Sequence, residues 1–257
     1  MMSTINCKIE GLLFNDFADH HRLEPTDKKA TTISQSTNDE HFEIEDDEET
    51  KELLVIEKDG TAKYDNPNRR LVYIVNYDKF ITSFKHKEGS VTAKKRCDAI
   101  VYTDDEQYFL LNELKQREIA KKGRKKEVRK KAIAQLKDSL TALFAVNTIQ
   151  EYIRPFRVKR CCYFNKKVAP PSPSITALTA FNRLNTLCNG LQLPEPDIEG
   201  FGFEFWEYTG EHTFQFSVPL QKKKTSLEEI AKNLSTLRPS EAIQLSKIIE
   251  FNHNIKP

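Results

Sequence analysis

Short apolar runs separated by polar turns occupy residues 71–114. Residues 71–77 (LVYIVNY), 98–103 (DAIVYT) and 107–114 (QYFLLNEL) are rich in β-branched and aromatic side chains. Apolar runs of this length, bounded by polar residues, predict β-strands. The acidic residues 104–106 form a short polar turn between the second and third runs. We therefore expect these two runs to form an antiparallel hairpin, with the first run as an additional strand.

A different hydrophobic period follows. Between residues 125 and 147 the large apolar side chains recur at steps of three and four, at Ile133, Leu136, Leu140, Leu143 and Phe144. This spacing places them on one face of an α-helix. We expect a helix over residues 125–147 that covers the sheet, and a further strand over residues 156–164.

The remaining patterns extend this organisation toward both ends of the chain. We expect a short strand and helix in residues 1–25, and a strand at 53–57 that ends in the turn at 58–60. Three prolines at 170, 171 and 173 mark a break. Beyond it the patterns predict a hairpin with strands at 200–208 and 213–218, and helices at 176–188, 226–237 and 239–251. The aromatic residues of that hairpin alternate with polar ones, which favours core packing, with stacking on bases as the alternative.

These elements define an α/β fold class, with a central mixed β-sheet flanked by helices. Residues 26–38 are polar without apolar periodicity, and residues 39–52 (DEHFEIEDDEETKE) are acidic. We expect a flexible acidic loop there. The predicted regions are an N-terminal segment (1–52), a core (53–168), and accessory strands and helices packed on the core (174–257).

The cysteines, the histidines and the hydropathy of the chain argue against several classes of protein. The five cysteines are odd in number and lack C-x-x-C spacing, which argues against a disulfide framework or a zinc site. The six histidines are scattered. No signal peptide and no apolar run of eighteen residues is present, so we expect a cytoplasmic protein without membrane contact.

Candidate chemistry lies at one end of the predicted hairpin. With the turn near residues 104 and 105, Asp98 and Glu113 face each other across the two strands. Side chains alternate along a strand, so Lys115 lies on the same side as Glu113, whereas Leu114 points to the opposite layer. Two adjacent carboxylates need a countercharge, which Mg²⁺ (or Mn²⁺) supplies. Lys115 can then stabilise charge on a phosphate or orient an attacking water. The expected reaction is phosphodiester hydrolysis.

This arrangement resembles the motif of the PD-(D/E)XK nucleases: Asp98, fourteen intervening residues, then Glu113, Leu114 and Lys115. The resemblance covers roughly residues 70–165 and implies a restriction-endonuclease-like core of helix, three-stranded meander, helix and strand. It assigns Asp98 and Glu113 as metal ligands, the Leu114 carbonyl as a further ligand and Lys115 as the catalytic lysine. Cys97 stands where the motif has proline.

The same resemblance raises two further assignments. Gln135, on the predicted helix, matches a glutamine that binds phosphate or the attacking water in several similar nucleases, although an ordinary helical amide explains it as well. The family often has an additional acid on its first helix. Several residues qualify here, and the sequence does not choose between them: Glu10, Glu40, Glu52 and Glu57.

A dense basic run follows the motif. Residues 115–131 carry ten Lys and Arg against Glu118 and Glu127. Such a run neutralises nucleic-acid phosphates in a salt-dependent manner, although many charge runs are simply solvated. The candidate nucleic-acid contacts are Lys121, Lys122, Arg124, Lys125, Lys126, Arg129 and Lys130. The acidic residues 39–52 could occupy this basic surface in the absence of nucleic acid, or serve only as a solvated linker.

We therefore expect a Mg²⁺-dependent endonuclease that acts on DNA, with RNA as an alternative substrate, in restriction or phage defence. Cleavage of both strands suggests a homodimer, or a protein partner bound through the C-terminal helices. The alternative is a non-catalytic nucleic-acid-binding or assembly module with the same fold. An ordinary surface hairpin with solvated charges, or a structural partner protein, also remains open.

Overall fold

The computed structural model describes residues 7–26, 32–47, 50, 52–116, 122–166, 190–210 and 212–217, and only the backbone of residues 122–126. These residues all lie in the compact unit that ends at Ser217. The helices expected at 176–188, 226–237 and 239–251 lie outside the described residues.

A seven-stranded mixed sheet forms the centre of the fold, in the order β1-β5-β6-β7-β8-β10-β9. Its strands are β1 (Ser34–Thr37), β5 (Val72–Asn76), β6 (Ala99–Thr103), β7 (Tyr108–Lys115), β8 (Val158–Asn165), β9 (Leu191–Leu193) and β10 (Glu204–Thr209). Strands β5, β6 and β7 form an antiparallel meander, whereas β7, β8 and β10 run parallel. The four strands expected between residues 71 and 164 are confirmed.

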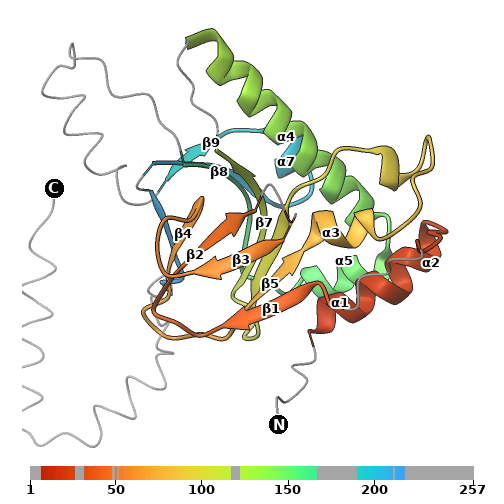
Figure 1. Ribbon diagram of the computed structural model, residues 1–257, viewed down its shortest axis with the longest axis horizontal. Helices are drawn as coiled ribbons and strands as arrows, with labels where there is room; N and C mark the ends of the chain where they lie inside the picture. The colour runs from red at the N-terminus through yellow and green to blue at the C-terminus, as the bar shows by residue number, and fades with distance from the viewer. Residues whose placement is uncertain are drawn as a thin grey trace, which may run out of the picture. The chain divides into compact units, whose positions relative to one another are not determined.

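Helices cover one face of this sheet (Figure 1). They are α1 (Lys8–Leu12), the π-helical turn η1 (Leu13–Phe17), α2 (Ala18–His20), α4 (Lys122–Phe144) and α5 (Asn147–Ile153). Helix α4 buries Leu136, Leu140 and Leu143, as its apolar spacing predicts. Parallel neighbours such as β7 and β8 require a crossover, and α4 with α5 provides it. Among the described helices, none is both long and apolar enough to span a bilayer.

Two features of the helical layer were not expected. The sequence predicts one helix and then a strand, but α5 forms a separate short helix that buries Ile149 and Ile153. The strand expected in residues 1–25 is not found in the described part of that segment, which is helical from Lys8 to His20. Shorter elements are α3 (Tyr77–Thr82), the 3₁₀ turn η2 (Val91–Ala93) and α7 (Pro196–Glu199).

A second, four-stranded sheet packs on the opposite face (Figure 1). It has the order β11-β4-β2-β3, formed by β2 (His41–Asp46), β3 (Leu53–Ile56), β4 (Ala62–Asp65) and β11 (Thr213–Gln215). Aromatic rings fill the space between the two sheets; Phe42 and Tyr64 stack with centroids 4.9 Å apart. The core packing expected of the C-terminal aromatic residues is confirmed for Tyr208, Phe214 and Phe216.

The loop expected within residues 26–52 is wrong over β1 and β2. In β2, Phe42 and Ile44 alternate with charged residues and are buried in the core between the sheets. Glu43 and Glu45 lie on the other face, where Glu43 accepts a hydrogen bond from the Gly60 amide. Two apolar side chains at a period of two are enough to form a strand, even in an acidic run. The boundary placed between residues 52 and 53 therefore falls inside the β2–β3 pair.

The hairpin expected at residues 200–218 is also wrong, because its two strands join different sheets. Strand β10 pairs in parallel with β8, and β11 pairs in parallel with β4. The chain turns at Gly210, which has a φ of 62° that glycine adopts without steric cost. This turn lets Phe214 and Phe216 pack on Tyr64 in the core between the sheets.

Candidate active site

Asp98 and Glu113 lie opposite each other at one end of the β6–β7 pair. Ala99 pairs with Asn112, and extending this register by one residue places Asp98 opposite Glu113. The Asp98 amide donates to the Asn112 carbonyl at 3.0 Å, so the pairing continues to the candidate acid. The geometry expected from the turn position is present.

Lys115 connects the two acids. Its ammonium forms an ion pair with the Glu113 carboxylate and lies 3.9 Å from Asp98 Oδ2. Leu114, between the two charged residues of β7, points to the opposite face and is buried in the core between the sheets. The structure thus brings together Asp98, Glu113 and Lys115, which we call the candidate site.

Burial perturbs the protonation of all three groups. Glu113 is 0% exposed and the Asp98 side chain 14% exposed. Burial raises the pKa of Asp98 to about 7, although Lys115 and the Leu114 amide oppose the shift. Burial and the Asp98 charge raise the pKa of Glu113 well above its ordinary range. Burial lowers the pKa of Lys115, but the two carboxylates outweigh this effect and the net pKa is raised. The acid pair therefore tends to hold protons unless additional positive charge is present.

The Leu114 amide orients the first acid. It donates to Asp98 Oδ2 at 2.6 Å, which fixes the carboxylate against β7. A charge-assisted hydrogen bond of this kind is short and strong. The sequence pointed only to the Leu114 carbonyl, whose role as a metal ligand stays a prediction.

The oxygen atoms of the candidate site are suitable ligands for a hard cation. Apart from its ion pair with Lys115, the Glu113 carboxylate accepts no hydrogen bond from the described residues. Buried carboxylate oxygens without donors are uncommon, and a divalent ion satisfies them. No group of three or more His, Cys, Asp or Glu converges on a metal position in the described part of the chain. Two carboxylates and a carbonyl suit Mg²⁺, which usually keeps several water ligands.

Asp46 is an additional acid near the candidate site that sequence reasoning missed. It ends β2, on the second sheet, and its charge raises the pKa of both Asp98 and Glu113. The alternation of Phe42 and Ile44 with charged residues was the signal, because it places Asp46 on the face toward the seven-stranded sheet.

The four acids considered earlier have other contacts or surroundings. Glu10 accepts hydrogen bonds from the Ile33 amide and the Ser34 hydroxyl. Glu40 pairs with Arg69 and Glu52 with Lys79. Glu57 is exposed beyond the end of β3. The described contacts of these residues do not involve the candidate site.

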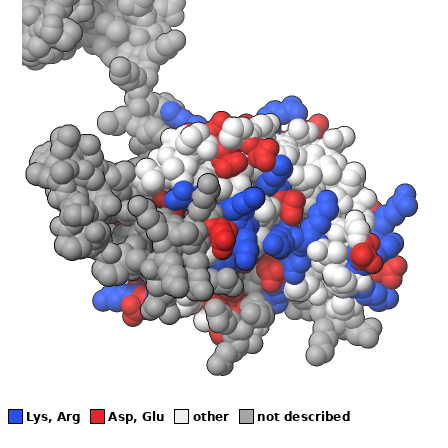
Figure 2. Space-filling view, turned by 90° about the horizontal axis from the view of Figure 1, so that it is seen from above, with Lys and Arg blue, Asp and Glu red and all other residues white. Residues whose placement is uncertain are grey.

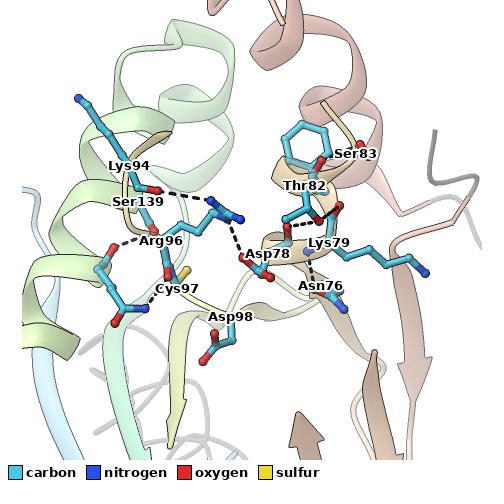
Figure 3. A network of polar contacts seen from close by, with 12 residues as sticks. Asn76, Asp78, Lys79, Thr82, Ser83, Lys94, Arg96, Cys97, Asp98 and Ser139 are labelled. Atoms are coloured by element: carbon cyan, nitrogen blue, oxygen red, sulfur yellow. Dashed lines mark hydrogen bonds and ion pairs between the residues drawn. The ribbon is translucent and has the colours of Figure 1, made fainter. Parts of the chain in front are cut away.

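Gln135 contacts the backbone that leads into Asp98. Its amide nitrogen donates to the Arg96 carbonyl at 2.9 Å, and one helical turn further on Ser139 accepts a hydrogen bond from the Cys97 amide at 2.8 Å (Figure 3). A proline at position 97 would have no N–H to donate. The cysteine at the motif's proline position therefore allows α4 to hold the strand that carries Asp98. Contact of Gln135 with phosphate stays a prediction.

A second anchor lies on the other side of Asp98. The Tyr77 amide donates to the Asp98 carbonyl at 3.0 Å, and Arg96 pairs with Asp78 at 2.6 Å. In Figure 3 the Asp98 carboxylate points away from the Arg96–Asp78 pair. The backbone of Asp98 is thus held from two sides while its side chain projects toward β7.

The residues expected to contact nucleic acid are only partly described. Lys121 lies outside the described residues, and the side chains of Lys122, Arg124, Lys125 and Lys126 are not described. Arg129 forms an ion pair with the buried Glu207 of β10, so it ties α4 to the sheet. Lys130 is exposed. Figure 2 shows a face on which Lys and Arg side chains gather with Asp and Glu between them.

Comparison of the chain with protein-family models, with curated proteins and with solved structures gives no match. The resemblance to PD-(D/E)XK nucleases stays a prediction that depends on the motif residues and their setting. That setting is the β5–β6–β7 meander followed by α4 and β8.

Proposed function

We propose that this protein is a metal-dependent endonuclease that hydrolyses DNA phosphodiester bonds, with a restriction-endonuclease-like core. The observation that carries the proposal is the convergence of Asp98, Glu113 and Lys115 at one end of the β6–β7 pair. The buried Glu113 and the largely buried Asp98, both with raised pKa values, form with Lys115 a site that a divalent cation would neutralise.

Each residue has a chemical role in this proposal. Asp98 and Glu113, with the Leu114 carbonyl, would hold Mg²⁺ or Mn²⁺. The bound ion supplies Lewis-acid polarisation of a phosphoryl oxygen and lowers the pKa of a bound water. Asp98 and Glu113 must give up their protons to act as ligands. Lys115, released from Glu113, would place its ammonium near the negative charge that develops on phosphorus.

The surroundings support nucleic acid as substrate. The basic first turns of α4 begin shortly after β7, close in sequence to the acids, and Lys130 is exposed on the same helix. Contacts of this kind bind the phosphate backbone without reading sequence. A cytoplasmic enzyme in restriction or phage defence that cuts both strands would act as a homodimer or with a protein partner.

One observation favours a second candidate, a non-catalytic nucleic-acid-binding or assembly module. Lys115 already pairs directly with Glu113. Asp98 and Glu113 share this lysine, so negative charge at the site is partly balanced without a cation. In this alternative the protein binds nucleic acid through the basic helix but does not cleave it.

A cleavage assay separates the two candidates. Plasmid DNA, a single-stranded oligonucleotide and an RNA oligonucleotide are incubated with protein in Mg²⁺, Mn²⁺ or chelator. Asp98→Asn and Lys115→Ala test the candidate site, and Asp104→Asn, an exposed acid at the other end of the same hairpin, is the matched control. Thermal unfolding checks that every variant folds.

The nuclease proposal predicts metal-dependent cleavage by wild type and Asp104→Asn, and a loss on the order of a hundredfold or more in the other two variants. Salt-sensitive binding without cleavage by any protein favours the binding module. Neither binding nor cleavage would contradict both candidates and direct attention to a protein ligand.

A further inference from the structure

Asn165 lies beside the candidate site on the neighbouring strand. It is the last residue of β8, and the register pairs it with Lys115 on β7 and Thr209 on β10. Paired residues of adjacent strands share one face of a sheet, so the Asn165 and Lys115 side chains point the same way. The row Lys115, Asn165 and Thr209 therefore crosses the ends of three parallel strands, where crevices in α/β sheets bind ligands.

The Asn165 carboxamide is buried and has no partner in the described part of the chain. Its residue is 1% exposed, and neither Oδ1 nor Nδ2 makes a hydrogen bond with a described group. Its backbone is engaged, since the Asn165 carbonyl accepts a hydrogen bond from the Gly210 amide at 3.1 Å. A buried amide without partners is destabilising compared with an apolar side chain of similar size, so a hydrogen-bonding ligand explains its presence.

The neighbours indicate the charge of that ligand. Lys115, directly beside Asn165, is cationic, and its pKa is raised. One row deeper on the same face lie Glu113, Tyr163 and Glu207, whose two carboxylates pair with Lys115 and Arg129. An ammonium next to amide N–H donors is suited to an anion with several oxygens.

We propose that Asn165 binds a backbone phosphate of the nucleic acid, donating from Nδ2 to a non-bridging oxygen beside Lys115. The inference rests on the proposed nucleic-acid substrate and adds a residue that positions it. Because Asn165 is neutral, its contribution is a directed hydrogen bond rather than general attraction to phosphate.

Asn112 provides a matched control. It is also a buried asparagine whose amide atoms have no partner among the described residues, and it immediately precedes Glu113. It pairs with Ala99 and Cys162, both in the core between the sheets, and so points to the opposite face. Lack of a partner is common to both residues; only Asn165 lies beside Lys115.

The test measures duplex oligonucleotide affinity by fluorescence anisotropy in chelator, together with cleavage in Mg²⁺. Asn165→Ala is expected to weaken binding roughly tenfold, in line with the loss of one hydrogen bond to a charged group. Asn165→Asp, which places a carboxylate beside the phosphate, should weaken it further, and Asn165→Ser, which keeps a donor, should weaken it less. Asn112→Ala should bind as wild type does, and thermal unfolding shows whether each variant is folded.

The outcomes separate this inference from the proposed function. Affinity unchanged in folded Asn165→Asp, or equal losses in the Asn112 and Asn165 variants, would overturn the phosphate contact even if wild type cleaves DNA. Selective loss of affinity in the Asn165 variants without cleavage by any protein would support the contact and contradict the nuclease. Absence of oligonucleotide binding by wild type would overturn the contact.

Discussion

Glu113 and Glu207 are two buried carboxylates on the same face of the seven-stranded sheet, and within the described part of the chain each forms an ion pair in a different setting. Glu113 pairs with Lys115 of its own strand, and a second acid, Asp98, shares that lysine. Glu207 pairs with Arg129, which comes from α4 on the layer above. The first pair concentrates negative charge in one place, whereas the second connects a helix to a strand.

The difference separates a chemical use of buried charge from a structural one. Burial and the neighbouring charge of Asp98 raise the pKa of Glu113, so this acid can exchange protons or bind a cation. An acid that holds a half-buried arginine from another layer fixes the position of that layer. We therefore expect substitution of Glu113 to affect cleavage more than stability, and substitution of Glu207 to affect stability more than cleavage.

The largest expected effect is on catalysis. Glu113→Gln should lower the metal-dependent cleavage rate on the order of a thousandfold, because a ligand for the cation is lost. Its folded stability should not fall, since the substitution removes a buried charge that Asp98 repels. Cleavage rates and chemical denaturation measure the two quantities. Retained cleavage by Glu113→Gln would contradict the assigned role.

The next effect is the pH dependence of stability at Asp98. The folded carboxyl has a pKa of about 7, against an ordinary value of 3.8 that represents the unfolded chain. The folded chain thus binds more protons between these pH values, and its stability falls as the pH rises through this window, by roughly 3 kcal/mol.

The Asp98→Asn variant has no titrating group at this position, so its stability should not show this fall with rising pH. Denaturation of both proteins at pH 4, 5, 6 and 7, without divalent cations, measures the difference. Parallel stability curves for the two proteins would contradict the raised pKa.

A smaller effect is expected at the structural pair. Glu207→Gln should lower the free energy of unfolding by about 2 kcal/mol, because the partly buried Arg129 guanidinium loses the negative charge that pairs with it. DNA cleavage by the folded variant should stay within a few-fold of wild type. If Glu207→Gln instead abolished cleavage without loss of stability, the structural role assigned to Glu207 would be contradicted.

The smallest expected effect concerns Gln135. Gln135→Ala should lower stability by about 1 kcal/mol through loss of the hydrogen bond to the Arg96 carbonyl. Its affinity for DNA should remain unchanged if anchoring is its role. Weaker DNA binding with unchanged stability would support the phosphate contact that the sequence resemblance implies.

The local sequence pattern was sufficient to predict the part of the candidate site that lies on one hairpin. Asp98, Glu113 and Lys115 lie on adjoining strands separated by a short turn, so strand alternation and turn position determined which side chains meet. The same reasoning predicted α4, because its apolar residues keep a helical period.

Residues brought together by long-range pairing were not predictable in this way. Asp46 acts on the candidate site through its charge, from a strand of the second sheet in a run whose composition is typical of a loop. Asn165 reaches Lys115 only because β8 pairs in parallel with β7 after a crossover. The hairpin expected at residues 200–218 was wrong for the same reason: alternation identifies a strand but not its partner.

Calorimetric titration of Mn²⁺ into wild-type protein and Glu113→Gln at pH 6 tests the central claim most directly. A cation site built on Asp98 and Glu113 predicts binding to wild type with release of protons, because the acids are partly protonated at that pH. The variant should bind at least tenfold more weakly. Absence of binding to wild type, or equal affinity in Glu113→Gln, would contradict the claim that these two carboxylates form the metal centre.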